Sequence, residues 1–537
     1  MNGVETMDSR PKAKQFAQPL PVDPDHVPLR SWIAVIGSML GAFMAVLDIQ
    51  ITNASLSDIV GGLGSSLEEG SWISTSYLVA EIIVIPLTGW LALVFSTRRY
   101  LMANSALFLF FSMCCAWAWD LPSMIIFRAL QGITGGVLIP MAFNIILTKL
   151  PASKRPMGFA MFGITATFAP AIGPTIGGWL TDTYHWTAIF YMNIVPGLVL
   201  LAAIWYGVES QPMKLSMLRK GDWWGILFMA LGLGSLIIVL EEGNRKDWFG
   251  SPFITRFAVI GTVSLIIFLV IEFLRKEPVI NLRLLARRNF GLGSVVNVAL
   301  GLGLYGASFI LPVYLAQIQG YNAMQIGETI MWAGLPQLFI MPLVPLLMKK
   351  FDIRTLISAG IVMFAASCFM NAFMTHDTAV DQLKWSQMLR ALGSPLIMVP
   401  LTELATGMIE KEQAGSASGL FNMMRNLGGS LGIAILSTML TRREQFHSVR
   451  LGESVSAFDL ATQQRLDQLT SAFINHGSDP TTAANQALGA LNNVVHREAS
   501  IMGFNDCFYI IGVALLLTLG AVWFSRKVKV SGQAMAH

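Results

Sequence analysis

The stretch Phe168-Ala-Pro-Ala-Ile-Gly-Pro-Thr-Ile-Gly-Gly-Trp179 is unusual for an apolar helix, because it contains two prolines and three glycines. Pro170 and Pro174 each remove a backbone hydrogen bond and bend a helix. Gly173 and Gly177 are four residues apart, so they leave one helix face smooth enough for another helix to approach closely. A bent, tightly packed helix suits a gate, and Gly178 belongs to the same gating and packing cluster.

The composition of the whole chain indicates an integral membrane protein. Hydrophobic residues make up 54% of the 537 residues and charged residues only 13%, and the mean hydropathy is +0.59. A soluble domain usually carries about a quarter charged residues. A deficit of this size excludes a series of soluble domains.

The apolar residues form runs of the length that a membrane helix needs, about 20 residues each. We expect about fourteen such helices. They begin near Trp32, Trp72, Leu101, Met124, Met157, Ala188, Trp223, Phe253, Gly291, Ile326, Leu356, Trp385, Ala414 and Asp506. The expected fold class is therefore all-α integral membrane.

Basic residues predict the orientation of these helices. Pairs such as Arg98 with Arg99 and Lys349 with Lys350 fall on alternate connections, which we assign to the cytoplasm by the positive-inside rule. The opposite short connections contain only Arg245, Lys246 and Lys384. Both termini are then expected in the cytoplasm. One long polar segment, residues 441–505, faces outside, and is either a tolerated excursion with some helix or a docking surface for a partner.

A faint internal repeat suggests two halves of like orientation. Arg128-Ala-Leu, followed by small residues and Pro140, resembles Arg390-Ala-Leu, followed by small residues and Pro400. Transporters place their substrate path between such repeats. We predict a cytoplasmic tail (1–30), a six-helix bundle (31–207), a linker with two extra membrane helices (208–290), a six-helix bundle that includes the outer segment (291–525, with 441–505) and a cytoplasmic tail (526–537).

Ionisable residues inside the predicted helices are the candidates for function, since each costs roughly 2.5–3.5 kcal/mol in hydrocarbon. Asp48 and Arg128 lie about five or six residues from the outer ends of their helices, a similar depth at which they can pair. Glu81 and Arg425 lie near the midplane. Glu403 lies nearer the inner end of its helix.

A carboxylate that faces a cavity can bind a proton on one side of the membrane and release it on the other. Burial raises the pKa of a carboxyl group and a neighbouring arginine lowers it, so a conformational change can couple proton binding to transport. We hypothesise this role for Asp48 first and Glu81 second, with Arg128 and Arg425 organising the site. The alternative is a static ion pair between Asp48 and Arg128. Loss of assembly in Asp48→Asn would favour that alternative.

Other classes of function have little support in the sequence. The pattern Gly301-Leu-Gly-Leu-Tyr-Gly306 matches a dinucleotide fingerprint, but it sits inside an apolar helix with no preceding strand and is interpreted as packing. There is no P-loop and no His-Glu-x-x-His, so neither direct use of ATP nor an enzyme is expected. We expect no cofactor and no metal site, with a proton gradient as the energy source and no nucleic acid as partner.

These motifs together resemble the fourteen-helix drug:proton antiporters of the major facilitator superfamily, in the EmrB/QacA-like group and closest to its EmrB branch. The similar segments are Leu47-Asp48-Ile-Gln-Ile-Thr-Asn53, Ile85-Pro-Leu-Thr-Gly-Trp-Leu91, Phe127-Arg128-Ala-Leu-Gln131-Gly132, Ala169-Pro-Ala-Ile-Gly-Pro-Thr-Ile-Gly-Gly178 and Phe421-Asn-Met-Met-Arg425-Asn-Leu-Gly-Gly429. The resemblance implies two six-helix bundles with two extra helices between them, and proton-coupled efflux of amphipathic drugs across the inner membrane. The segment from Thr441 to Phe458 resembles the long outer loop of the EmrB branch, which implies a periplasmic adaptor and an outer-membrane channel as partners.

One motif departs from the family pattern. The cytoplasmic loop motif keeps Gly89, Arg98 and Arg99 but has Leu93 where the superfamily has an acid. An acid-based cytoplasmic latch is therefore in doubt. Two alternatives to multidrug efflux stay open: export of one metabolite, such as a fatty acid or a siderophore, and a membrane sensor or scaffold that transports nothing.

Overall fold

The computed structural model describes residues 27–219, 221–275, 280–410, 413–456 and 458–528. Every regular element within these ranges is a helix. Most of the two predicted tails, residues 1–30 and 526–537, lies outside the described residues. The helical content confirms the expected all-α class.

The helices fall into three groups along the chain. The N-terminal group contains α1 (Leu29–Ala54), α2 (Leu56–Gly62), α3 (Leu67–Val84), α4 (Thr88–Phe95), α5 (Thr97–Ala116), α6 (Leu121–Gly135), α7 (Leu138–Lys149), α8 (Arg155–Thr183), α9 (Ala188–Tyr191) and α10 (Ile194–Gly207). The middle segment contains α11 (Ser216–Arg219), α12 (Trp223–Glu242), η1 (Trp248–Gly250), α13 (Pro252–Leu274) and η2 (Leu282–Ala286). The C-terminal group contains α14 (Arg288–Gln317), α15 (Ala323–Ile340), η3 (Met341–Leu343), α16 (Val344–Lys350), α17 (Ile353–Asn371), α18 (Val380–Thr406), α19 (Ala414–Ser454), α20 (Leu460–Asn475) and α21 (Pro480–Phe524).

Most of these helices are long and apolar enough to cross a membrane. Eleven spans in the described part of the chain meet that condition, and two bent helix pairs raise the number to thirteen. The fourteenth expected span, which begins at Ala414, corresponds to α19. It packs against α14 and α21 within the C-terminal group, although it is not among those thirteen.

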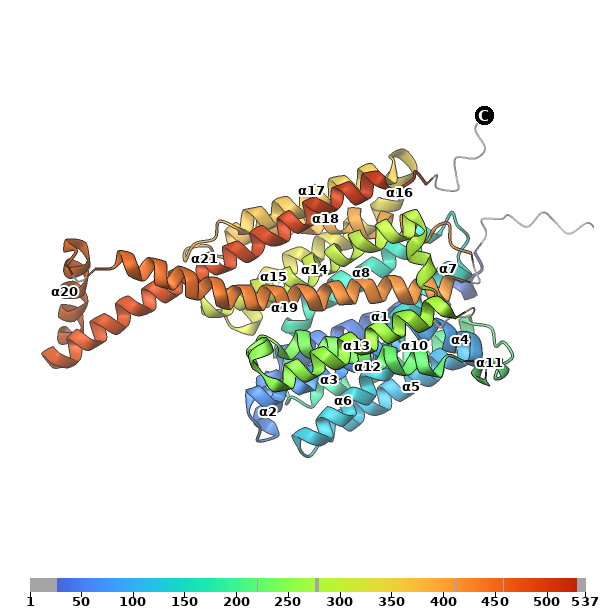
Figure 1. The fold of residues 1–537 in the computed structure, drawn as a ribbon, viewed down its shortest axis with the longest axis horizontal. Helices are drawn as coiled ribbons and strands as arrows, with labels where there is room; N and C mark the ends of the chain where they lie inside the picture. The colour runs from blue at the N-terminus through green and yellow to red at the C-terminus, as the bar shows by residue number, and fades with distance from the viewer. Residues whose placement is uncertain (1–26, 220, 276–279, 411–412, 457, 529–537) are drawn as a thin grey trace, which may run out of the picture.

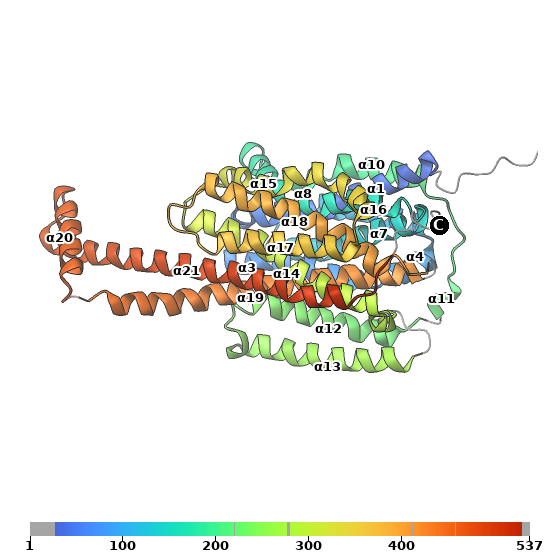
Figure 2. The same ribbon diagram turned by 90° about the horizontal axis from the view of Figure 1, so that it is seen from above.

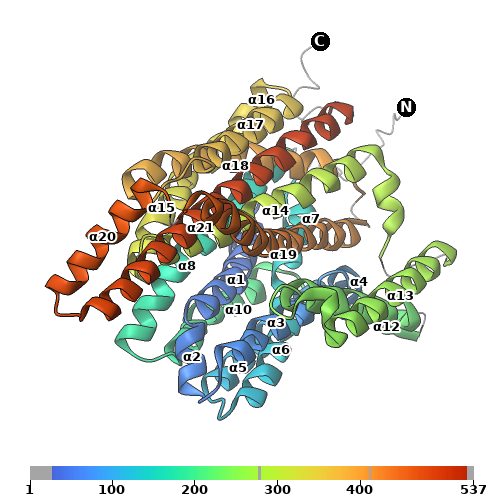
Figure 3. The same ribbon diagram turned by 60° about the vertical axis from the view of Figure 1, so that its left-hand side comes forward.

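The N-terminal and C-terminal groups lie side by side (Figure 3). Within the first, α1 packs against α7, α8 and α10, and α6 packs against α3 and α5. Within the second, α14 packs against α19 and α21, and α17 against α18. Contacts between the groups are made by α8 with α15 and α18, and by α19 with α4 and α7.

The pair α12 and α13 lies at the edge of the molecule (Figure 2). Helix α12 joins it to α3 and α19, and Phe253 of α13 packs edge-on against Trp72 of α3, with ring centres 6.1 Å apart. The buried carboxylate of Glu242 accepts hydrogen bonds from Ser71 and Thr75 of α3, both at 3.1 Å, and pairs with Arg245. Trp248 donates a hydrogen bond to Thr438 of α19 at 3.1 Å. The middle segment therefore contacts both groups.

A helical hairpin projects from one end of the bundle (Figures 1 and 2). It consists of the extended ends of α19 and α21, with α20 across its tip. We call this the distal end, and the opposite end, where α1 begins and α21 finishes, the proximal end. The predicted outer segment 441–505 is thus almost entirely helical rather than a loop, because two membrane helices continue beyond the bundle and satisfy their own backbone hydrogen bonds.

The proline and glycine cluster bends and packs α8 as predicted. The helix axis turns by 46° between the segments Arg155–Pro170 and Ile172–Thr183. A Cβ added at Gly173 would lie 2.6 Å from Cβ of Gln50, and one at Gly177 would lie 3.2 Å from the carbonyl oxygen of Ile51. The glycines therefore allow the close contact between α8 and α1.

Close helix contact also explains Gly301 on α14. A Cβ there would lie 2.1 Å from the carbonyl oxygen of Arg425 on α19. The interpretation of this glycine-rich pattern as packing is confirmed, and the contact sets the position of the Arg425 backbone.

We expect Gly301→Ala to lower the free energy of unfolding by about 1–3 kcal/mol, because backbone atoms cannot move aside for the added methyl group. Gly520→Ala on α21 is the matched control, since nothing lies within 4 Å of a Cβ there. Thermal unfolding of the purified protein in detergent measures both variants. Equal stability of the two would contradict the close approach of α14 and α19.

Candidate functional site

Asp48 and Arg128 form a buried ion pair, as their similar predicted depths allow. Nη1 of Arg128 donates to Oδ2 of Asp48 at 2.6 Å. The other carboxylate oxygen, Oδ1, accepts hydrogen bonds from Gln131 at 3.1 Å and from Asn193 at 2.7 Å. Asp48 thus receives three donors from two other parts of the chain.

The guanidinium of Arg128 is held equally firmly. Nη1 also donates to Gln131 at 2.7 Å, and Nε donates to the carbonyl of Ile73 at 3.4 Å. The group lies over the ring of Tyr77 at 4.4 Å from its centroid. This cluster joins α1, α3, α6 and the start of α10, all in the N-terminal group. This geometry matches the static ion pair between Asp48 and Arg128 that the sequence left open as an alternative.

Glu81 on α3 has very different surroundings. Its side chain is 3% exposed, yet its carboxylate forms no hydrogen bond with any residue in the described part of the chain. Two cations act on it electrostatically: Arg128 from its own group and Arg425 from the C-terminal group. Glu81 is thus a buried acid on which an arginine of each group acts electrostatically.

A cavity with about 560 Å³ of empty space inside and at its mouth lies between the two groups. Gln50 of α1 and Pro170 of α8 line it from the N-terminal group. The C-terminal group contributes Leu304, Tyr305, Ser308, Ile330, Ala333, Gln337, Arg390, Ser394, Met398 and Arg425. Asp48 and Glu81 are not among the lining residues.

Arg425 connects this cavity to Glu81. Its Nη2 donates to Asn422 at 2.9 Å, and its guanidinium lies 5.7 Å from the centre of the Phe162 ring. Tyr305, which also lines the cavity, is within electrostatic reach of both Arg425 and Glu81. A change of charge on Glu81 therefore changes the electrostatic environment of two residues that line the cavity, Tyr305 and Arg425.

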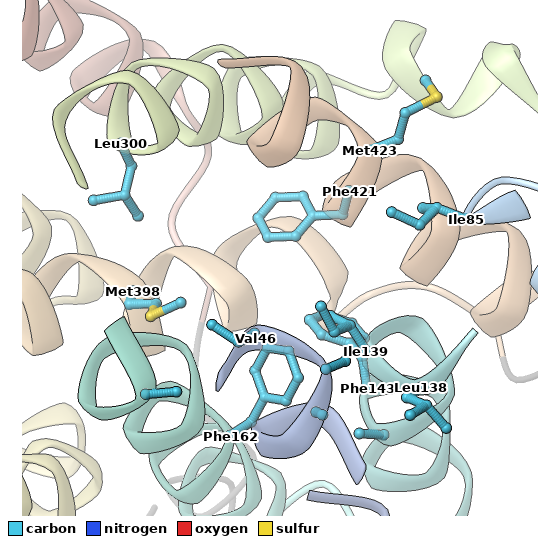
Figure 4. Close-up of a cluster of buried hydrophobic side chains, with 14 of the residues drawn as sticks. Val46, Ile85, Leu138, Ile139, Phe143, Phe162, Leu300, Met398, Phe421 and Met423 are labelled. Carbon is cyan, nitrogen blue, oxygen red and sulfur yellow. The ribbon is translucent and has the colours of Figure 1, made fainter. Parts of the chain in front are cut away.

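An apolar cluster closes the space between the groups on the proximal side (Figure 4). Phe143 of α7 lies between Phe162 of α8 and Phe421 of α19, with ring centres 5.8 Å and 6.1 Å apart. Ser418 of α19 donates a hydrogen bond to the carbonyl of Pro140 at 2.8 Å. Aromatic packing and one backbone hydrogen bond thus join the two groups here.

The glycine of the loop motif contributes to the same closure. A Cβ added at Gly89 of α4 would lie 2.5 Å from the carbonyl carbon of Gly415 at the start of α19. Leu93 is half exposed. Arg98 lies over the ring of Trp205 at 5.6 Å, and Arg99 is exposed. Direct backbone contact therefore holds α4 against α19 at this point.

Glu403 lies near the proximal end of α18 and is buried. Its Oε2 has no hydrogen-bond partner among the described residues, and Arg155, at the start of α8, acts on it electrostatically. This carboxylate also lies where the two groups meet. It is separate from the Asp48 cluster.

Three functional candidates were missed from the sequence. Asn193 lies just before α10. An asparagine at a helix start does not show from the sequence that its side chain reaches the buried Asp48. Gln337 and Arg390 line the cavity, but only the direction of each side chain reveals this. Arg390 had one sequence indication, its repeat relationship to Arg128.

The family model described as Major Facilitator Superfamily matches residues 38–433 of this chain. The multidrug export protein EmrB of Escherichia coli K12 is 32% identical over 92% of this chain and 95% of its own length. The fatty acid resistance protein FarB of Neisseria gonorrhoeae is 29% identical over 95% of this chain and 99% of its own. The solved proton:xylose symporter XylE has the same fold, with a TM-score of 0.58 at 15% identity over 93% of this chain and 97% of that one.

This chain belongs to the major facilitator superfamily, as an EmrB-like member. It is a multi-pass membrane protein, in agreement with its helices. The resemblance drawn from the motifs is confirmed.

We expect Asp48→Asn to destabilise the protein by about 3–5 kcal/mol, because Arg128 keeps a buried charge without its counterion. Combining it with Arg128→Gln should recover about 0.5–3 kcal/mol relative to the sum of the single variants. Asp182→Asn, at an exposed position on α8, is the control. Additive losses in thermal unfolding would show that the pair does not act as a unit.

Proposed function

We propose that this protein is a proton-coupled antiporter that exports amphipathic and hydrophobic compounds across the inner membrane. The observation that carries the proposal is the buried carboxylate of Glu81, which bonds to no described residue and on which an arginine of each helix group acts electrostatically. The name of the Escherichia coli relative, a multidrug export protein, supports the direction and the range of transport.

Glu81 is the residue to which we assign the transported proton in this conformation. When ionised, it attracts Arg425 across the interface between the groups. A proton on Glu81 removes this attraction without breaking a hydrogen bond. Protonation therefore weakens the electrostatic attraction between Glu81 on α3 and Arg425 on α19, which is the coupling that an alternating-access transporter needs.

Asp48 and Arg128 have a positioning role in this proposal. Protonating Asp48 in the present conformation would disturb three hydrogen bonds, one of which is the ion pair with Arg128. Its release from Arg128 belongs to another conformation, in which Asp48 can take part in proton transfer. Arg425 and Glu403 are second candidates, because both lie where the groups meet.

The energy of a proton gradient suffices for this task. One charge crossing 100 mV yields roughly 2.3 kcal/mol. That free energy corresponds to a concentration ratio of about fiftyfold per proton. No catalytic reaction and no cofactor enter the cycle.

We further propose how the chain is divided and oriented. Residues 31–207 and 291–525 act as two bundles that rock about the cavity, and residues 208–290 carry the two extra helices. The bent region around Pro170, Gly173, Pro174, Gly177 and Gly178 gates the cavity from the side of α8. Gly89, with Arg98 and Arg99, closes the proximal end, where α1 begins and α21 finishes and which faces the cytoplasm.

The projecting hairpin is then periplasmic, and we propose that it binds a periplasmic adaptor that leads to an outer-membrane channel. Its apolar side chains support this assignment. Phe458 is 94% exposed, and Leu460 and Val449 are also exposed. Such residues far from the bundle are not needed for packing.

Export of one fatty acid is the second candidate function, favoured by the name of the relative FarB. The two candidates differ in range. A panel of lipophilic cations, uncouplers and fatty acids, tested for proton release, separates a broad exporter from a dedicated one.

We expect Glu81→Gln to abolish substrate-driven proton release from inverted membrane vesicles with an imposed pH gradient, because glutamine cannot carry the proton. The inserted protein should remain folded, since the Glu81 carboxylate bonds to none of the described residues. Glu209→Gln, at an exposed position after α10, should behave as wild type. If Glu81→Gln also collapses the gradient, the proton is carried elsewhere, and Asp48 becomes the candidate.

We expect the pair Phe458→Ser and Leu460→Ser to keep proton release in vesicles but to lose resistance in whole cells, because vesicles need no adaptor. Matched serine replacements at Leu517 and Trp523, exposed on the membrane part of α21, serve as the control. Full resistance of the hairpin variant would remove Phe458 and Leu460 from the docking surface.

A further inference from the structure

The two repeated Arg-Ala-Leu segments place their arginines in different surroundings. Arg128 is paired with Asp48. Arg390, on α18, is only 7% exposed, yet its guanidinium has no hydrogen bond and no ion pair with any described residue. Among the described residues, the thiol of Cys368 is the one titratable group that acts on it electrostatically.

The sequence of the C-terminal group explains the difference. Helix α14 follows the middle segment as α1 follows the N-terminal tail, and α14 contains no aspartate or glutamate. Helix α17, which packs along α18, contains none either. The group that would neutralise Arg390, as Asp48 neutralises Arg128, is therefore not supplied by these two neighbours.

Arg390 is instead one of the residues that line the cavity. The other charged lining residue is Arg425, so the cavity wall carries two positive charges and no negative one. Two further polar atoms on these lining residues lack partners among the described residues: Oε1 of Gln337 and Nε of Arg425. Buried polar atoms without partners are costly, and a bound ligand is one way to pair them.

We infer that the cavity takes amphipathic organic anions, and that Arg390 binds their anionic head group. The inference rests on the proposed function and names the substrate class of the same cavity. A guanidinium presents a fixed fork of donors that matches a carboxylate in a bidentate arrangement. The apolar body of the ligand then lies against Leu304, Ile330 and Met398.

Arg390 suits this role better than Arg425 because its guanidinium has fewer contacts with other side chains. Arg425 already donates to Asn422 and stacks on Phe162, and it lies within reach of Glu81. Arg390 has none of these partners. A cation in the same cavity would meet two positive charges and no carboxylate on the wall.

Binding of a charge series to the purified protein in detergent tests the inference, with no proton gradient present. The probes are 1-naphthaleneacetate, its neutral amide and 1-naphthylmethylammonium, which share one aromatic body. The wild-type protein should bind the acetate at least about tenfold more tightly than the amide, a difference of about 1.4 kcal/mol. The ammonium should bind most weakly. Equal binding of the acetate and the amide, or tighter binding of the ammonium, would overturn the inference.

Variants then assign the head-group contact to one residue. Arg390→Gln should reduce the preference for the acetate over the amide to about onefold, and Arg390→Lys should keep part of it. Arg256→Gln, which removes a positive charge at an exposed position on α13, should keep it in full. A full preference in folded Arg390→Gln would overturn the role of Arg390. The wild-type charge series needs no variant, so the substrate class is tested even if Arg390→Gln does not fold.

The failure of this inference can be told apart from the failure of the proposed function. If the acetate binds with the expected preference but releases no protons from vesicles, the proposed antiport fails while the anion site stands. If vesicles release protons with cations and the acetate does not bind, the anion site fails while antiport stands.

Discussion

A charge inside a membrane protein is costly unless it is paired, and the ion pair of Asp48 with Arg128 is the most completely bonded charged group that the described residues contain. The carboxylate and the guanidinium satisfy each other and gather donors from α6 and the start of α10. Because α1, α3, α6 and α10 meet at this one cluster, their depths relative to each other are set by it. The N-terminal group is thus organised around a polar centre.

The contact between the two groups is built on different principles. Gly89 and Gly415 bring backbone to backbone, and Phe143 packs against Phe421. Such contacts are close but carry little directional bonding, so they can be broken and remade at small cost in hydrogen bonds. Rigid polar packing within a group and apolar packing between groups are what rocking motions require, since each group has to move as one body.

Much of this arrangement could be predicted from the sequence, for identifiable reasons. Depth along a helix follows from counting residues, so the partnership of Asp48 with Arg128 was accessible. The spacing of Gly173 and Gly177 predicted a close helix contact, although not that α1 would be the partner. The rotation of each helix about its axis was not accessible. Hence the isolation of Glu81 and the exposure of Arg390 to the cavity required the structure. The sequence predicted only some helix in the outer segment, because the outer parts of α19 and α21 are polar, and hydropathy marks a helix only while it remains in the membrane.

The difference between Arg128 and Arg390 shows how a repeated motif can serve two ends. In both copies an arginine enters from the distal side, followed by the same two residues. One copy retains a carboxylate on a neighbouring helix, which makes its arginine a structural centre. The other has no carboxylate on α14 or α17, which leaves a buried cation at the cavity wall. If both arginines were paired with carboxylates, neither would have a free charge with which to bind a ligand. Arg128 has a counterion and stabilises the N-terminal group, whereas Arg390 lacks one and leaves its charge at the cavity wall. This difference between the two halves is the basis for a binding site.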